Sequence, residues 1–431
     1  MVPVVGWLSV KPTPYRFQMH LDEADQARLA GESGPAVAMA MELVVAAGRA
    51  MGADSLLDIR SAHVDSCLYH GLASLDFAER LSAAGARVVV PTTLNVASLD
   101  LLHPDLFRGD ALVARRARAL MDAYVEMGCQ PSWTCAPYQL ANRPRLGDQI
   151  AWGESNAIVF ANSVLGARTN RYGDFLDICC ALTGRAPASG LHTDEGRRAT
   201  LQVDVDAPDS WRDNDLFYVA LGHVLGRRVG TRVAVLTGLD QRADEDRLKS
   251  LGAAAASSGA VGMFHVAGVT PEAATVEEAC GGSPPALVAA IGADDLRRAV
   301  SELSTTSSST LGAVSVGTPH ASLREMAALA DLVSGRKTVV PFYVNTGRDI
   351  VAAADAAGHV GVIEEFGATI VTDTCTYVTA VMGQPQGAVM TNSGKWAHYA
   401  PGNLGVDVVL AGLEDCVESA TTGRVQFEGL A

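Results

Sequence analysis

The sequence predicts an α/β protein of two or three subdomains that share one central cleft. Its 431 residues allow two or three domains at roughly 150 residues per domain. Hydrophobic residues make up 48% and charged residues 19%, a globular composition that excludes disorder as the main state. Short apolar strands alternate with helical patterns along the chain, which is the rhythm of an α/β fold.

In the first part of the chain, capping residues and periodicity predict the elements. A helix is expected from near Leu21 with Asp22 as its cap, and a second over 35–51, ended by Gly52. A strand over 56–59 leads into a polar loop over 61–66. The next expected elements are a helix over 73–84, a buried strand over 86–90 ended by Pro91, and helices over 111–128, 157–165 and 175–182.

In the second part, a polar stretch over 190–215 indicates a boundary or excursion, and a Ser/Thr-rich linker over 303–310 is the clearest composition shift. Strands are expected over 233–236, 261–266, 313–316, 338–340 and 368–371, and helices over 243–255, 322–333 and 347–357. The expected divisions are an N-terminal extension (1–20) and three α/β subdomains (21–200, 201–305 and 306–431).

Charge and targeting signals narrow the class of protein. The formal net charge of −15 disfavours nucleic acid, whose binding requires a basic face, and anionic membranes. No stretch has the roughly 20 strongly apolar residues of a membrane span, and the start carries no secretory signal. Eight cysteines without a CxxC pair indicate no disulfide scaffold. The expectation is a reduced, cytoplasmic protein.

Seven loops are denser in polar residues than ordinary turns, and most of them follow an expected strand. Strand carboxyl ends are where α/β proteins bind ligands, although any one such loop can simply be a turn. The loops are 61–67, 91–95, 131–138, 154–156 with 162–163, 317–320, 372–376 and 391–395.

Three residues in these loops are candidates for metal binding, reactivity or ligand binding. Cys135 and Cys375 lie in loops rather than on apolar helices, which favours reactivity or metal binding. Lys395 follows a Ser-Gly turn and is suited to holding a carboxylate or phosphate. There is no GxxxxGK[ST] phosphate loop, and Gly222, Gly226 and Gly230 do not have the Rossmann spacing.

Taken together, the loops resemble the large, catalytic subunit of aconitase X, and within it the bacterial branch that includes cis-3-hydroxy-L-proline dehydratases. The match runs from about residue 20 to the C-terminus. The segments that carry the resemblance are 63–69 (HVDSCLY), 91–95 (PTTLN), 131–138 (PSWTCAPY), 152–157 (WGESNA), 160–169 (FANSVLGART), 182–187 (LTGRAP), 373–375 (DTC) and 390–402 (MTNSGKWAHYAPG).

The resemblance implies an aconitase-like architecture and an iron–sulfur cluster or iron that acts as a Lewis acid on a leaving hydroxyl. Its metal ligands would be Cys135, Cys375 and the position of Thr318, where relatives have Gly-Cys-Pro-His. A threonine hydroxyl is a poor iron ligand, so Cys129 or His320 could replace it. Further departures from the family are Ser66 in place of glycine and Thr376-Tyr377 after Cys375.

The resemblance also implies a hydro-lyase that removes water from a small β-hydroxy acid such as cis-3-hydroxy-L-proline. The base would be a serine on a small swivel domain, supplied as a separate subunit, so the protein would be a heteromer. We expect catalytic roles for Lys395, His63 and Ser393. The residues expected to bind substrate are Asp65, Ser66, Cys67, Asn95, Ser155, Asn156 and Arg168.

Two alternatives are left open by the sequence. The replacement of cysteine by Thr318 is compatible with a cluster-free homologue that runs another elimination or isomerisation on a specialised metabolite. The other alternative is a non-catalytic subunit that only binds a ligand. Against it stands the general pattern that a site which has lost its activity usually loses several of its polar loops together.

Overall fold

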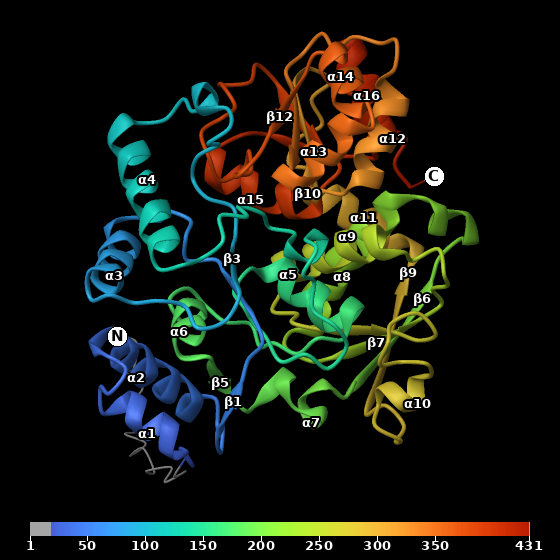
Figure 1. Cartoon of the computed structure of the whole chain (residues 1–431). Coiled ribbons are helices and arrows are strands. Elements are labelled where there is room, and N and C mark those ends of the chain that lie inside the picture. The colour runs from blue at the N-terminus through green and yellow to red at the C-terminus, as the bar shows by residue number, and fades with distance from the viewer. Residues whose placement is uncertain (1–18, 431) are drawn as a thin grey trace, which may run out of the picture.

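Three parallel β-sheets organise the chain, one in each third of the sequence (Figure 1). The structure is a computed structural model that describes residues 19–430. The strand orders are β3-β2-β4, β8-β7-β6-β9 and β12-β11-β10-β13-β14, and β1 pairs with β5 in an antiparallel ribbon. The strands are β1 (Leu56–Asp58), β2 (Ala62–Val64), β3 (Thr92–Leu94), β4 (Ala151–Trp152), β5 (Arg185–Pro187), β6 (Leu201–Asp206), β7 (Ala234–Thr237), β8 (Phe264–Val266), β9 (Leu287–Gly292), β10 (Leu311–Ala321), β11 (Phe342–Thr346), β12 (Ala368–Val371), β13 (Ala388–Thr391) and β14 (Val408–Leu410).

Helices cover the sheets, as a parallel sheet requires, since both of its faces are apolar. They are α1 (Glu23–Leu29), α2 (Pro35–Ala50), α3 (Leu72–Ala83), α4 (Ala111–Glu126), α5 (Ser155–Phe160), α6 (Leu176–Thr183), α7 (Asp194–Arg197), α8 (Asp215–Val229), α9 (Glu245–Ser258), α10 (Val276–Ala279), α11 (Ala293–Leu303), α12 (Leu323–Val333), α13 (Arg348–Ala356), α14 (His359–Phe366), α15 (Gly394–Leu404) and α16 (Leu413–Thr422). The α/β class is confirmed. Each of the three expected α/β subdomains contains one parallel sheet, and their exact boundaries stay a prediction.

Two expected strands are wrong, and for the same reason. The chain is irregular over 86–90 and 338–340, and the strands β3 and β11 begin after Pro91 and Pro341. Proline fixes φ and has no N–H for a ladder, so it is tolerated just before or at the start of a strand. Val89 and Val339 are 62% and 65% exposed, so these valines are not the buried core that their composition suggested.

Other differences lie at the polar loops. Strand β6 lies inside the polar stretch 190–215, where a boundary or excursion is expected, so this stretch is in part regular structure. His63 and Thr93 lie within β2 and β3 rather than in loops, and the segment 317–320 belongs to the long strand β10. His63 and Thr93 contact each other across β2 and β3, and His320 lies beside the Cys135 and Cys375 thiols.

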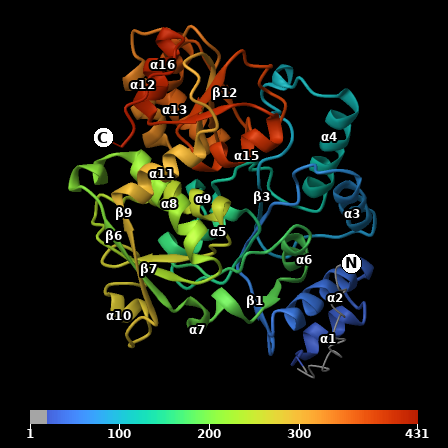
Figure 2. The same cartoon turned by 180° about the vertical axis from the view of Figure 1, so that it is seen from behind.

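The three parts of the chain meet around α5, α9 and α15, which lie near the middle of the molecule in Figures 1 and 2. Helix α9 packs closely on α8, and this contact explains the glycines over 222–226. A Cβ on Gly222 would lie 2.2 Å from the Leu251 carbonyl oxygen, and one on Gly226 would lie 2.1 Å from Ser258 Oγ. These glycines serve helix packing. Within the described residues, no helix combines the length and apolar character needed to cross a bilayer.

Candidate active site

Polar side chains follow the carboxyl ends of parallel strands from two different sheets. Asp65, Asn95 and Glu154 follow β2, β3 and β4 of the first sheet, and Cys375 and Lys395 follow β12 and β13 of the third. The carboxyl ends of parallel strands share one edge, and the two edges face each other across the subdomains. The structure therefore brings together residues that are up to 330 positions apart in the sequence, because Asp65 and Lys395 both interact with Glu154.

Cys135, His320 and Cys375 form the most compact group in this region. One potential ligand atom from each of the three lies within 4.8 Å of the other two, and all three residues are buried. The backbone N–H of His320 also donates to Cys135 Sγ at 3.2 Å. The expected approach of Cys135 and Cys375 is thus present, and His320 stands beside them. Cys129 is buried in the core of the first subdomain and is not part of this group.

The loops that carry Cys135 and Cys375 share an unusual backbone conformation. Trp133 and Asp373, each two residues before its cysteine, adopt left-handed φ angles of 44° and 59°. Such angles are costly for residues other than glycine and persist only where neighbouring contacts enforce them. At Asp373 such contacts are present, because Arg348 donates two hydrogen bonds to the Asp373 carboxylate, at 2.5 and 2.6 Å. The turns direct both thiols toward one point.

The Cys135 and Cys375 thiols influence each other's protonation. Burial raises the pKa of Cys135, but a hydrogen bond from Cys375 and the nearby ammonium of Lys395 lower it to about 6. The same hydrogen bond, together with burial, raises the pKa of Cys375 well above its usual range. One thiolate therefore exists at neutral pH, and a metal ion binding here would displace the remaining proton.

The His320 ring is oriented by Thr134. His320 Nδ1 lies 3.0 Å from Thr134 Oγ1, and that oxygen also accepts a hydrogen bond from the Ala136 N–H at 3.1 Å. If Nδ1 donates to Thr134, Nε2 carries the lone pair that a metal requires. Nε2 lies 3.2 Å from the Thr374 carbonyl oxygen, to which it donates only when it carries the ring proton, so metal binding at Nε2 requires that proton on Nδ1. The hydroxyl of Thr318 is buried without a hydrogen-bond partner. The two thiols and the imidazole are a donor set that fits a transition metal.

Replacing Thr134 by valine is expected to weaken metal retention by about 10- to 100-fold, because the group that orients the His320 ring would be lost while the side-chain volume is kept. Metal per chain after dialysis against a graded series of chelator concentrations measures the effect. Thr183→Val is the matched control, since Thr183 is also a buried threonine but bonds the Cys179 carbonyl oxygen on α6 rather than His320. Equal retention in the Thr134 variant and the wild type would contradict this role.

Lys395 is buried in an ion pair with Glu154. Glu154 also accepts hydrogen bonds from Asn156 Nδ2 and the Ala157 N–H, at 2.5 and 2.6 Å, so it caps α5 while it holds the lysine. Burial lowers the pKa of Lys395, but the Glu154 carboxylate outweighs it, so the ammonium remains charged. Asn156 in turn donates to the Cys135 carbonyl at 2.8 Å. These hydrogen bonds connect the Lys395 ammonium, through Glu154 and Asn156, with the backbone of Cys135.

A second buried carboxylate, Asp177, organises the loop after β2. It accepts hydrogen bonds from the Asp65 N–H at 2.7 Å, the Ser66 N–H at 3.2 Å and the Ser66 hydroxyl at 2.9 Å. The Tyr124 hydroxyl donates to Ser66 Oγ at 2.9 Å. Ser66, where the family resemblance leads us to expect glycine, is therefore held by hydrogen bonds to Asp177 and Tyr124.

The structure also shows what the sequence did not single out. Glu154 was named only as part of a loop, and Asp177 only as part of a helix. The sequence signal for Glu154 was its place in the polar segment 154–156, and the structure adds that Gly153 has no room for a Cβ, which would lie 2.6 Å from Asp177 Oδ2. No signal in the sequence identified Asp177.

Asp65 is the most perturbed carboxyl of the site. Burial, reinforced by the charge of Glu154, raises its pKa to about 8. A raised carboxyl pKa means that the folded state holds the proton more tightly than the unfolded chain. The stability contributed by this proton is therefore full at low pH and is lost as the pH rises toward 8.

We expect the free energy of unfolding to fall by about 2 to 3 kcal/mol between pH 5 and pH 7 because of Asp65, at about 1.4 kcal/mol per pH unit. Asp65→Asn should remove that part of the fall. Urea unfolding at both pH values, for the wild type and the variant, measures it. The same slope in both proteins would assign the pH dependence to other groups.

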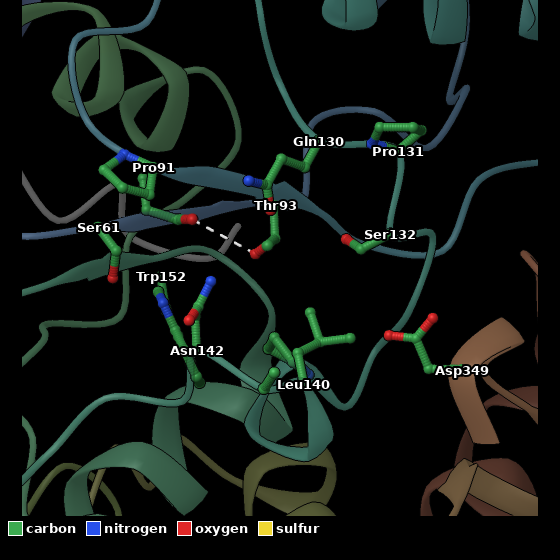
Figure 3. A pocket seen from close by; sticks show the side chains of 13 residues that line it. Ser61, Pro91, Thr93, Gln130, Pro131, Ser132, Leu140, Asn142, Trp152 and Asp349 are labelled. Atoms are coloured by element: carbon green, nitrogen blue, oxygen red, sulfur yellow. Dashed lines mark hydrogen bonds between the residues drawn. The ribbon is translucent and has the colours of Figure 1, made fainter. Parts of the chain in front are cut away.

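His63 lies on β2, two residues before Asp65, and is fully buried. Its Nδ1 lies 2.8 Å from the hydroxyl of Thr93, the residue directly opposite on β3. Thr93 lines a hollow of about 300 Å³ between the first subdomain and α13, which Figure 3 shows with Ser132, Asn142 and Asp349 on its walls. Burial lowers the pKa of His63 to about 3, so the ring is neutral.

The remaining expected site residues are placed as follows. Ser393 caps α15, because its hydroxyl accepts the Trp396 N–H at 3.0 Å. The Ser155 hydroxyl lies 3.4 Å from Glu154 Oε1, and the Cys67 thiol donates to the Asn95 backbone carbonyl oxygen at 3.3 Å. Arg168 is outside the group, where it pairs with Asp194 at 2.5 Å and bonds the His192 carbonyl. These contacts leave its expected role in substrate binding without support.

Curated relatives define the class of this protein. It is 48% identical to a cis-3-hydroxy-L-proline dehydratase of Pseudomonas aeruginosa, over 94% of this chain and 70% of that protein. A phosphomevalonate dehydratase large subunit of Methanothermobacter thermautotrophicus is 39% identical over 91% of this chain and 96% of that protein. Each relative is a dehydratase, and the chain is a carbon–oxygen hydro-lyase.

The family follows from models of three successive domains. The aconitase X first, second and third domains match residues 18–195, 199–328 and 311–422. The chain belongs to the aconitase X family. A crystal structure of Thermococcus kodakaraensis aconitase X in its holo-form superposes with a TM-score of 0.84 at 35% identity, over 93% of this chain and all of that one. The expected aconitase-like architecture is confirmed.

Proposed function

We propose that this chain is the large, catalytic subunit of a dehydratase that acts on cis-3-hydroxy-L-proline. The observation that carries the proposal is the convergence of Cys135, His320 and Cys375, three potential metal ligands, with the buried pair of Lys395 and Glu154. The dehydratases of Pseudomonas aeruginosa and Hypocrea jecorina, at 48% and 40% identity, support the choice of substrate.

The chain's residues would position the substrate by its carboxylate. Lys395 supplies a buried cation, and Ser155 and Asn156 at the start of α5 supply polar groups beside it. The reaction removes the proton next to the carboxylate and the β-hydroxyl as water. The resulting enamine then becomes a cyclic imine acid by moving its N–H proton to carbon.

We propose iron as the cofactor, as a single ion or in an iron–sulfur cluster. Cys135, Cys375 and either His320 or Thr318 would hold it, because thiolate and imidazole donors suit iron. Bound there, it would supply Lewis acidity toward the leaving hydroxyl. Iron and sulfide content and the visible spectrum of anaerobically purified protein distinguish the ion from the cluster.

We propose a small swivel-domain subunit as the partner and the source of the serine base. Two observations support this. The archaeal relatives are named large subunits, and the hydroxyproline dehydratases are longer than this chain, which spans 70% of their length. Full dehydratase activity of this chain alone would contradict the proposal.

The test of the function is an assay of the chain, co-expressed with its candidate small subunit, on four compounds. Formation of the cyclic imine from cis-3-hydroxy-L-proline, with none from the trans-3- or trans-4-hydroxy isomers, is the expected result. Dehydration of phosphomevalonate instead would show that this chain has the activity of the archaeal relatives, and it would contradict the proposed substrate. The cluster-free and non-catalytic alternatives are not favoured, because the potential ligands converge and the relatives are dehydratases.

A further inference from the structure

One short segment of the first subdomain contacts both loops that carry the candidate metal ligands. It comprises residues 94–101 and begins at the last residue of β3. At its start, the Leu94 carbonyl oxygen accepts a hydrogen bond from the Thr134 N–H at 3.1 Å, next to Cys135. At its other end, the segment contacts the residues that precede Cys375. A single segment that touches both loops is placed to set the separation of the two thiols.

Asp100 makes the densest contacts at the far end of this segment. Its carboxylate is 3% exposed and accepts the N–H and the hydroxyl of Thr372, in the third subdomain, at 2.8 and 2.9 Å. From its own subdomain it accepts the N–H groups of Leu102 and His103 at 2.9 and 2.8 Å. Hydrogen bonds to a charged group are the strong ones, so a buried carboxylate with four such donors is a directional anchor.

Asp373, the next residue of the same loop, is held by the backbone of the segment. Its carbonyl oxygen accepts the Ala97 N–H at 2.7 Å, and its Oδ2 accepts the Leu101 N–H at 2.9 Å. The left-handed φ of 59° at Asp373 persists only because such contacts enforce it. Together with Arg348, the segment therefore fixes the turn immediately before Cys375.

The two sides of Cys375 are held by different subdomains. After the cysteine, the Thr376 N–H donates to Asn345 Oδ1 at 3.0 Å, within the third subdomain. Before it, the contacts come largely from the first subdomain, whose connection from β3 to α4 runs beside the loop after β12 in both views (Figures 1 and 2). The position of the Cys375 thiol relative to Cys135 thus depends on hydrogen bonds that cross the subdomain boundary.

We propose that Asp100 is a positioning residue that sets the spacing of the Cys135 and Cys375 thiols and thereby their joint affinity for a metal ion. The inference rests on the proposed function, since it takes the two thiols as metal ligands. Groups behind the ligands orient them, and their loss weakens metal binding because a displaced thiol no longer meets the required bond length and angle. Asp100 itself is assigned no contact with metal or substrate.

The probe is Cd²⁺, a soft ion that favours thiolate ligands, added to the metal-free chain. Its affinity for the site is the part of Cd²⁺ binding that Cys135→Ser removes, measured by thiolate-to-cadmium ultraviolet absorption in competition with a chelator. Asp100→Asn should weaken this affinity by about 10- to 100-fold, because an amide keeps the shape but has only one acceptor oxygen. Thr372→Val, which loses only the hydroxyl bond, should weaken it less, and Thr372→Ser should retain the wild-type affinity.

The matched control is Asp25→Asn. Asp25 is a fully buried carboxylate on α1 that accepts two hydrogen bonds from Arg185, at 2.9 Å each. Its replacement should lower the free energy of unfolding in urea and leave the Cd²⁺ affinity of the folded protein unchanged. This comparison separates positioning of the thiols from a general loss of stability.

Wild-type Cd²⁺ affinity in both Asp100→Asn and Thr372→Val overturns the proposal, and iron uptake with dehydration by the wild type would then leave the proposed function standing. If Asp100→Asn does not fold, the difference between Thr372→Val and Thr372→Ser decides, and equal affinities overturn the proposal. A protein whose Cd²⁺ affinity falls in these variants, but which does not dehydrate cis-3-hydroxy-L-proline, would refute the proposed function and leave this inference standing.

Discussion

Lys395→Met is expected to abolish dehydration, with a loss of at least about 1000-fold in kcat/KM, and also to destabilise the fold. The ammonium is the cation proposed to hold the substrate carboxylate, and its removal leaves Glu154 ionised and unpaired inside the protein. Removing one partner of a buried ion pair costs about 3–5 kcal/mol. Urea unfolding and steady-state kinetics measure the two effects.

The two effects can be separated. In the double variant Lys395→Met with Glu154→Gln, no unpaired charge remains, so stability should return to within about 1–2 kcal/mol of the wild type while activity stays lost. Lys249→Met is the matched control, because Lys249 is a buried lysine paired with Glu325 outside the site. It should lower stability and leave kcat/KM of the remaining folded protein unchanged. An active double variant would exclude Lys395 from substrate binding.

Cys135→Ser and Cys375→Ser should each reduce bound iron to near zero after anaerobic reconstitution. Each removes one of two thiol ligands from a group whose ligand atoms lie within 4.8 Å. A serine hydroxyl is a poor donor to iron compared with a thiolate. Thr318→Cys should act in the opposite direction and raise iron retention, because it would complete the three-cysteine set that the family resemblance implies. Iron per chain measures all three.

Cys416→Ser is the control for these variants. Cys416 is as buried as Cys375 but lies on α16 in the core of the third subdomain. Its replacement should lower stability without changing iron per chain. Equal, near-zero iron in the wild type and Thr318→Cys would contradict the metal site and favour a cluster-free enzyme.

The sequence by itself determined the fold class, the helices and the family. Helices with clear caps, such as α1 after Asp22 and α12 after Ser322, begin where the capping residues indicate, because a cap is a local hydrogen bond. Cys135 and Cys375 were also identified by their loops and by the resemblance, as was Lys395. These features depend on a few neighbouring residues and are readable from one segment.

Only the tertiary structure decided the strand positions at Pro91 and Pro341 and the partners within the site. A short apolar run does not reveal whether a neighbouring strand is present to pair with it. The pairing of Lys395 with Glu154 and the support of Asp65 by Asp177 join segments 241 and 112 residues apart. The choice of His320 over Cys129 beside the thiols likewise depends on two sheets facing each other. Such contacts arise from the packing of whole subdomains, and no local pattern encodes them.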